Sequence, residues 1–232
     1  MNREVNGTAN YRPDIDGLRA VAVLPVLFYH AGVSFTGGYV GVDVFFVISG
    51  FLITRLLVRD LERGRFSLLE FWHRRVRRIF PALFVMVLFT VVAGGFLMIP
   101  ADYKELGQSV VAQSLLVANI FFWDDTGYFA RAAESKPLLH TWSLAVEEQF
   151  YVLFPVVLAW LSRSGKAHAR RLLGIALLLS FAASLPGPSC FPTTAFYLLP
   201  TRAWELLLGG ILVFLPELKK SAAAVFWPCK DC

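Results

Sequence analysis

Apolar runs long enough to cross a lipid bilayer recur along this 232-residue chain and constrain its fold more than any other feature. Because the bilayer core offers no water to unpaired backbone groups, such runs cross it as α-helices. Charged residues make up 17% of the chain, below the roughly 25% of soluble domains. The polar gaps between the runs are short, which leaves no room for a separate soluble domain. The sequence therefore predicts an all-α, polytopic membrane protein.

Arginines concentrate between the second and third apolar runs, in residues 59–78. Cytoplasmic loops of membrane proteins carry an excess of Lys and Arg, so this segment predicts a cytoplasmic N-terminus. We expect a membrane-embedded domain over residues 1–216 and a cytoplasmic tail over 217–232. The domain is expected to contain about six spans, at residues 18–33, 38–58, 79–99, 142–161, 172–185 and 201–215.

Residues 109–123 form an apolar segment that is short for a full crossing. If it crossed, the basic loop at 162–171 would lie outside the cell. The positive-inside rule therefore favours a re-entrant or interfacial segment.

The net charge of +5 does not indicate nucleic-acid binding, since its densest cluster, RRVRR at 74–78, lies beside a predicted span. Cys229 and Cys232 form a C-x-x-C at the end of the chain. Two thiols cannot close a four-ligand zinc site, so no metal site is expected.

Arg19 and His30 lie in the first apolar run, eleven positions apart. At about 100° and 1.5 Å per residue, they share one helix face about 16 Å apart along the axis. Ionisable residues inside a membrane normally face a bundle interior or an aqueous cavity. The alternative is an arginine that reaches the headgroups and a histidine bonded to a nearby carbonyl. The pair on one face favours a functional passage lined by both residues.

Residue counts place four polar groups at one level near the outer leaflet: His30, Asp43, Glu147 and Glu205. Such a layer requires pairing or a cavity. A histidine beside a carboxylate is a common general base, and Asp43 is our expected partner for His30. Ser143, Glu147 and Tyr151 recur every four residues, which predicts a polar stripe facing the interior. The structural alternative pairs Glu147 or Glu148 with Arg202 or His140 only to hold helices together.

Near the cytoplasmic face, Arg19 is expected to converge with the arginines at 74–78. Arginine suits phosphate and pyrophosphate oxygens, although contact with anionic lipid would explain the cluster as a whole.

Five stretches, in this order, resemble the membrane-bound acyltransferase-3 family, bacterial enzymes that O-acylate surface polysaccharides and other acceptors. They are YRPDIDGLRA at 11–20, GVDVFFVISGFL at 41–52, RRVRRIFPA at 74–82, PLLHTWSLAVEEQFY at 137–151 and LPTRAWEL at 199–206.

The resemblance implies a multi-pass protein of the bacterial inner (plasma) membrane that transfers an acyl group, acetyl first among them, from acyl-CoA to a carbohydrate hydroxyl. No tightly bound cofactor is expected; the partners are the lipid bilayer, acyl-CoA and the carbohydrate acceptor. His30 would deprotonate the hydroxyl or assist an acyl relay. The resemblance carries over His30 for catalysis, Arg19, Arg75 and Arg78 for the donor, and Trp142 and Arg202, which lie in its motifs, for the acceptor. The residue counts above add Asp43 and Glu147 for catalysis and Tyr151 and Glu205 for the acceptor.

Family members continue with further spans, whereas this sequence contains about six, so we expect an incomplete, C-terminally truncated bundle. Two alternatives follow from the residues. Intramembrane His, Asp and Glu could form the relay of a proton-coupled transporter, or the chain could be an inactive acyltransferase fragment.

Overall fold

The structure, a computed structural model, describes residues 13–33, 37–125 and 136–215. Every regular element in these ranges is a helix, which confirms the all-α class. The predicted tail and its two cysteines lie outside the described residues. The helices are α1 (Pro13–His30), α2 (Val40–Glu62), α3 (Leu68–Leu97), α4 (Pro100–Ser114), α5 (Ala118–Asp124), α6 (Thr141–Ser162), α7 (Lys166–Ser184), α8 (Gly187–Cys190), α9 (Pro192–Tyr197) and α10 (Leu199–Leu212).

Three of the described helices, α2, α3 and α6, are long and apolar enough to cross a membrane. They correspond to the second, third and fourth predicted spans. The remaining predicted spans form α1, α7 and α10, which do not meet the same criteria of length and composition. The described residues therefore contain three helices fit to span a membrane, and the count of six stays a prediction.

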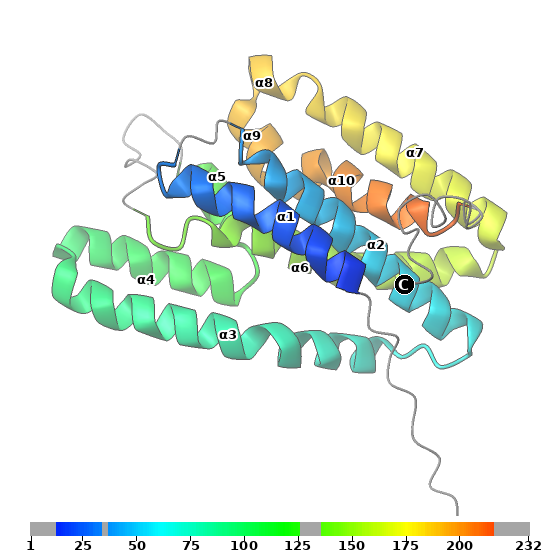
Figure 1. The fold of residues 1–232 in the computed structure, drawn as a ribbon, viewed down its shortest axis with the longest axis horizontal. Helices are drawn as coiled ribbons and strands as arrows, with labels where there is room; N and C mark the ends of the chain where they lie inside the picture. The colour runs from blue at the N-terminus through cyan, green and yellow to red at the C-terminus, as the bar shows by residue number, and fades with distance from the viewer. Residues whose placement is uncertain (1–12, 34–36, 126–135, 216–232) are drawn as a thin grey trace, which may run out of the picture.

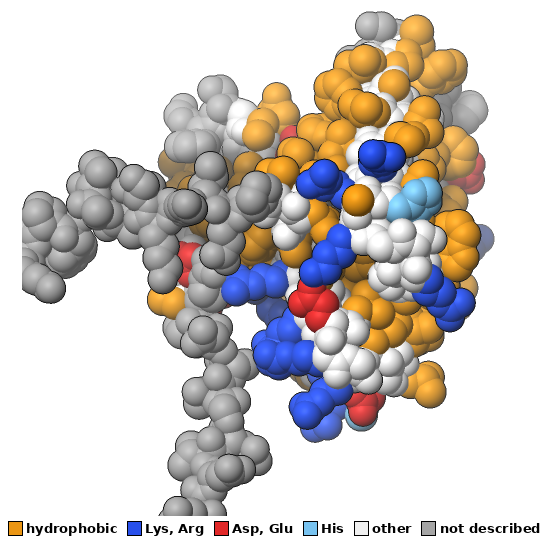
Figure 2. Space-filling model, turned by 90° about the vertical axis from the view of Figure 1, so that its right-hand side faces the viewer, with side chains coloured by type: hydrophobic (Ala, Val, Ile, Leu, Met, Phe, Trp, Pro, Cys, Tyr) orange, Lys and Arg blue, Asp and Glu red, His pale blue; other side chains and the backbone are white. Residues whose placement is uncertain are grey.

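The long helices lie side by side and alternate in direction, so the chain crosses the bundle repeatedly (Figure 1). α10 packs against α2 and α7, α6 packs against α2, α5 and α7, and α1 packs on α2. Lys and Arg side chains gather at the end of the bundle where α2 ends and α3 and α7 begin (Figure 2). We call this the basic end. The C-terminus of α1 and the start of α10 lie at the opposite end.

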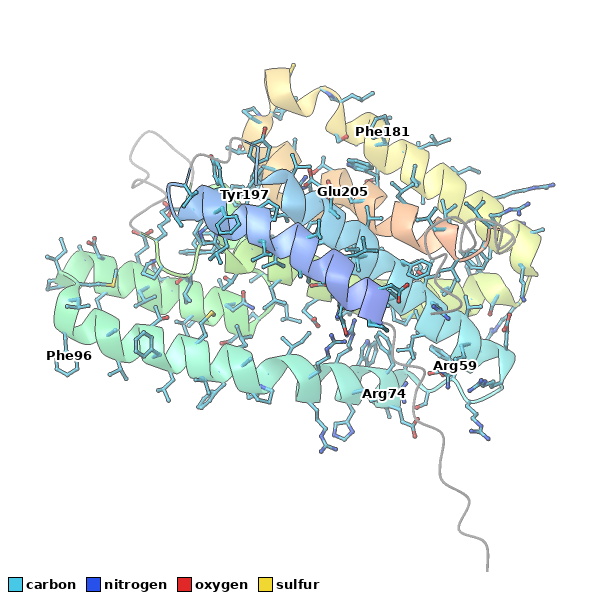
Figure 3. All side chains as sticks on the ribbon, viewed as in Figure 1. Arg59, Arg74, Phe96, Phe181, Tyr197 and Glu205 are labelled. Atoms are coloured by element: carbon cyan, nitrogen blue, oxygen red, sulfur yellow. The ribbon has the colours of Figure 1, made fainter. Side chains whose placement is uncertain are left out.

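The third helix begins earlier than predicted, at Leu68. The Ser67 hydroxyl accepts the backbone N–H of Glu70 at 3.4 Å and caps the helix. The arginines at 74–78 are therefore helical, and Arg75 and Arg78, three positions apart, lie on one side of α3. Along the rest of α3 the large apolar side chains are exposed, and Phe96 points away from the bundle (Figure 3). Such a surface suits lipid.

Two glycines allow α2 and α10 to touch through their backbones. A Cβ atom at Gly50 would lie 1.9 Å from the Leu206 carbonyl oxygen, and one at Gly209 would lie 1.9 Å from that of Val47. Small residues at a helix crossing permit this close packing in membrane proteins. The contact sets how the two helices present their polar residues to each other.

Residues 109–123 form parts of two helices, with a break at residues 115–117 where Leu116 takes a left-handed φ of 60°. Gln149 stabilises the break because its Nε2 donates to the Leu116 carbonyl at 2.8 Å. α4 runs back along α3, and α5 then packs against α6 and α9 (Figure 1). The segment is therefore not one continuous span.

A buried lysine connects the two parts of this region. Lys136, whose side chain is 7% exposed, forms ion pairs with Asp125 at the end of α5 and with Glu105 of α4. Burial and the nearby Asp125 raise the pKa of the Glu105 carboxyl, against the opposing effect of Lys136. The cluster ties α4 and α5 to the segment that leads into α6.

Candidate functional site

A cavity of about 780 Å³ lies at the end of the bundle opposite the basic end, and we call it the histidine chamber. Side chains from α1, α2, α6, α9 and α10 and from the residues before α6 line it. The lining includes four predicted site residues: His30, Asp43, Trp142 and Arg202.

His30 is the last residue of α1, and its ring is held by that helix. The Nδ1 atom lies 2.8 Å from the Val26 carbonyl oxygen, one turn back. Because a carbonyl oxygen only accepts hydrogen bonds, Nδ1 carries the proton in the neutral ring. The lone pair then resides on Nε2. The predicted base therefore has the tautomer that a general base needs, fixed by its own helix.

A second imidazole meets His30 in the chamber. The rings of His30 and His140 lie edge to face, with centroids 4.3 Å apart. Partial burial and the neighbouring His30 lower the pKa of the His140 imidazole. His140 therefore stays neutral at a lower pH than an ordinary histidine does. His140 was absent from our predicted site. The signal that could have included it is its place seven residues before Glu147, which puts it on the same helical stripe as Ser143, Glu147 and Tyr151.

The expected pairing of His30 with Asp43 is wrong. The Asp43 Oδ1 atom lies 2.9 Å from Nη1 of Arg202, and the same nitrogen lies 2.7 Å from Oε1 of Glu205. A guanidinium offers five donors, and α10 places it directly opposite Asp43 on α2. The side chain of Glu205 is 1% exposed, so Arg202 supplies the cation that a buried carboxylate requires.

Aromatic rings surround the Arg202 guanidinium on the chamber wall. Its carbon lies 5.4–5.9 Å from the ring centroids of Phe46, Trp142 and Phe196. Trp142 and Phe196 also pack against each other, with centroids 4.6 Å apart. Figure 3 shows Tyr197 and Glu205 in this part of the molecule, well away from Arg59 and Arg74 at the basic end. Aromatic faces beside a fixed polar group are suited to a ring-shaped, hydroxylated ligand.

The predicted donor-binding residues lie together towards the basic end, and we call Arg19, Arg75 and Arg78 the arginine cluster. Arg78 interacts electrostatically with both other members. The Arg75 guanidinium lies 4.4 Å from the centroid of the Tyr151 ring. The Nε atoms of Arg19 and Arg75 are buried without a hydrogen-bond partner among the described residues. Arg74 faces elsewhere, since it pairs with Asp60 and Glu70.

Glu147 lies close to the arginine cluster and interacts electrostatically with Arg78. Residue counting had placed it in the outer layer with His30. The Tyr151 hydroxyl donates to its carboxylate, and both side chains are buried. His140, the residue before α6, touches His30, so α6 starts level with His30. Glu147 lies seven residues further along, about 10 Å inward from that level. Neither Glu147 nor Tyr151 lines the histidine chamber. The polar stripe on α6 is real, and it reaches the arginines of α3.

The helix α1 carries one member of each group, Arg19 in its second turn and His30 at its last residue. The chamber reaches α1 as far as Val23, and Arg19 lies outside its lining. The described residues therefore contain two polar centres on one side of α1, and a single passage lined by both Arg19 and His30 stays an expectation.

Comparison with known proteins identifies one family over most of the chain. Residues 12–230 match the model of the acyltransferase-3 family, described as an acyltransferase domain. The chain is 38% identical over 223 residues to a peptidoglycan O-acetyltransferase, OatA, of Listeria monocytogenes, covering 93% of this chain and 36% of that protein.

Two staphylococcal proteins that the chain matches are also named as O-acetyltransferases. A putative O-acetyltransferase of Staphylococcus aureus strain MSSA476 is 39% identical over 216 residues, and the O-acetyltransferase OatA of strain NCTC 8325 is 35% identical over 216 residues. Each match covers 88% of this chain and 35% of the relative. The chain thus spans about a third of the length of the curated relatives it matches. No solved structure matches it.

Proposed function

Since the chain belongs to the acyltransferase-3 family, we propose that it takes part in O-acetylation of a cell-envelope polymer, moving an acetyl group from acetyl-CoA to a carbohydrate hydroxyl. The Listeria relative is named for peptidoglycan, which makes a glycan of this type the first acceptor to test. The observation that carries the proposal is the His30 imidazole, which lies on the wall of a large chamber with its Nδ1 atom bonded to Val26.

In this proposal, His30 acts as general base at the acceptor. Its Nε2 atom takes the proton of the sugar hydroxyl as the oxygen attacks the thioester carbonyl, and the C–S bond breaks to release CoA as the thiolate. The proton then passes to the leaving thiolate or to water. His140, in ring contact and neutral, can accept a hydrogen bond from the acceptor or from protonated His30. Trp142 and Phe196 would support the sugar ring, and Arg202, held by Asp43 and Glu205, would fix its orientation.

The arginine cluster would hold the phosphates of the donor. Arg19 and Arg75 each bury an Nε atom that lacks an acceptor among the described residues, and phosphate oxygens are the acceptors that suit a guanidinium best. The nearby Glu147 carboxylate is engaged by the Tyr151 hydroxyl, and Arg19 lies 3.9 Å from Asp16, a loose pairing that a phosphate could replace. We assign the cluster to the cytoplasmic side and the chamber to the outer side, on the positive-inside rule.

The test is a transfer assay with the chain reconstituted in vesicles. Labelled acetyl-CoA is supplied at the arginine-cluster side and a soluble glycan at the other. His30→Ala should reduce label transfer by at least about 100-fold, the lower range for loss of a general base. His168→Ala, a histidine outside both centres, is the matched control and should retain transfer.

Other outcomes separate the alternatives. Proton or solute flux without label on the glycan would contradict the acyltransferase reaction and support a transporter. Label retained on the protein of a His30 variant would favour an acyl relay over direct attack. Acetyl-CoA binding that is weakened by Arg75→Gln, in a chain that transfers no label, would place the donor site here and the rest of the reaction in the longer protein.

A further inference from the structure

Two adjoining hollows open at the basic end of the bundle, between the ends of α2, α6, α7 and α10. Their volumes are about 390 and 250 Å³. They share Val58 and Glu62 of α2, Lys166 of α7 and Phe214 after α10. We treat them as one groove, the α7 groove, because the same side chains border both. None of these residues belongs to the histidine chamber or the arginine cluster.

The α7 groove combines an apolar floor with a cationic edge. Val58, Leu158 and Phe214 contribute apolar surface, and Lys166 and Arg170 contribute positive charge. Lys166 forms an ion pair with Glu62, in which the two side chains are 73% and 49% exposed. A pair this exposed adds little stability, so Lys166 can exchange its partner readily. A ligand suited to the groove must be anionic at one end and apolar at the other.

The surroundings add to the positive charge. Arg163 and Arg171 flank the groove residues in sequence, and no ion pair is recorded for Arg163, Arg170 or Arg171 within the part of the chain that the structure describes. Figure 2 shows Lys and Arg side chains gathered on this end of the molecule beside hydrophobic ones. Glu62 is the carboxylate that lines the groove. The net charge of the lining is therefore positive.

We propose that the α7 groove binds an anionic phospholipid. The lipid phosphate lies between Lys166 and Arg170, and an acyl chain follows Val58 and Phe214. Basic pockets between membrane helices bind anionic headgroups in this way, and each Lys or Arg near the surface strengthens the attraction. This assignment rests on the proposed orientation, in which the basic end faces the cytoplasmic headgroups; a membrane lipid then reaches the groove without leaving the bilayer.

A competing occupant is the chain's own continuation after Leu215. Residues 216–232 contain three lysines against one glutamate and one aspartate. A segment of positive net charge does not complement a positive groove, which favours the lipid.

The experiment compares lipid retention by the full chain in native mass spectrometry after exchange into mixed micelles with phosphatidylglycerol or phosphatidylcholine. The unmodified chain should retain phosphatidylglycerol in preference. Neutralising two groove cations in Lys166→Gln/Arg170→Gln should weaken that preference about tenfold. The control Arg63→Gln/Arg65→Gln removes the same charge at the same end of the bundle, outside the groove, and should change it by less than about twofold. Glu62→Gln should strengthen retention, because it removes the carboxylate that competes for Lys166.

Three results would overturn the proposal. Equal losses in the two double variants would show diffuse attraction without a site. Retention only after removal of residues 216–232 would assign the groove to the chain itself. Displacement of the lipid by millimolar inorganic phosphate would show that the apolar floor contributes nothing. Thermal melting of each variant checks that a loss of lipid does not reflect unfolding.

Discussion

Arg202 on α10 and Asp43 on α2 are joined by an ion pair of 2.9 Å, and the same Arg202 nitrogen holds the buried Glu205. The pairing joins two residues that lie 159 positions apart in the sequence. It also fixes one wall of the histidine chamber, because Arg202 and Asp43 both line it. The integrity of the chamber should therefore depend on this triad.

Arg202→Gln should lower the free energy of unfolding by about 3–5 kcal/mol, because it leaves Asp43 and the fully buried Glu205 without their cation. Asp43→Asn should cost less, since Arg202 keeps Glu205. Denaturant unfolding in detergent micelles measures both. Arg163→Gln, an exposed arginine, is the control, and an equally small effect at position 202 would contradict the triad.

Gly50→Ala should disrupt the crossing of α2 and α10, since its Cβ atom would lie 1.9 Å from the Leu206 carbonyl oxygen. Separating two packed helices costs about 1–3 kcal/mol or more, and the chamber should widen with it. Gly107 lies in α4, and a Cβ atom added there would have no other atom within 4 Å. Gly107→Ala should therefore be neutral or stabilise the protein by up to about 1 kcal/mol. If the two substitutions gave the same melting temperature, the close contact would be refuted.

The stability of the protein should fall as the pH drops below about 6.5, in part through His140. Its pKa is lowered from the ordinary 6.5 by partial burial and by His30. The unfolded chain then binds more protons than the folded one around this pH, so stability rises with pH across that window. His140→Asn should flatten the dependence of the melting temperature between pH 5 and pH 7.5. A slope that survives the substitution would assign it to other groups.

Lys136→Met should destabilise the protein more at pH 8 than at pH 5. The pKa of Glu105 is raised by burial and by Asp125, and Lys136 opposes the rise. Without the lysine, the pKa of Glu105 rises further in the folded protein. A raised pKa stabilises the folded state only below the ordinary glutamate pKa of 4.5, and this contribution is lost as the pH rises. We expect a loss of about 3 kcal/mol at pH 8, measured by denaturant unfolding. Lys104→Met, on the same helix as Glu105, is the control.

Residue spacing predicted the local features of this chain correctly where a single helix decides them. Arg19 in the second turn of α1 and His30 at its last residue are eleven positions apart on one helix, and Tyr151 reaches Glu147 across one turn of α6. Counting also predicted that Arg19 meets the arginines at 74–78, and Arg78 does interact electrostatically with Arg19 and Arg75.

Counting failed where depth depends on how a helix is placed. Glu147 was assigned to the outer layer from the expected start of its span, but α6 begins beside His30 and carries Glu147 inward to α3. The split of residues 109–123 into α4 and α5 was missed for a similar reason. The break at Leu116 is stabilised by a hydrogen bond from Gln149 of α6. The residues around Leu116 give no local signal from which such a long-range bond could be predicted.

The sequence by itself determined the helical class, the family and the residues that share a helix face, because periodicity and composition are properties of the chain alone. The tertiary structure decided the partners: Arg202 for Asp43 and His140 for His30. Electrostatic pairing depends on which side chains lie within a few ångströms of each other. That distance is set here by backbone contact between α2 and α10 at Gly50 and Gly209 and by the packing of α1 on α2.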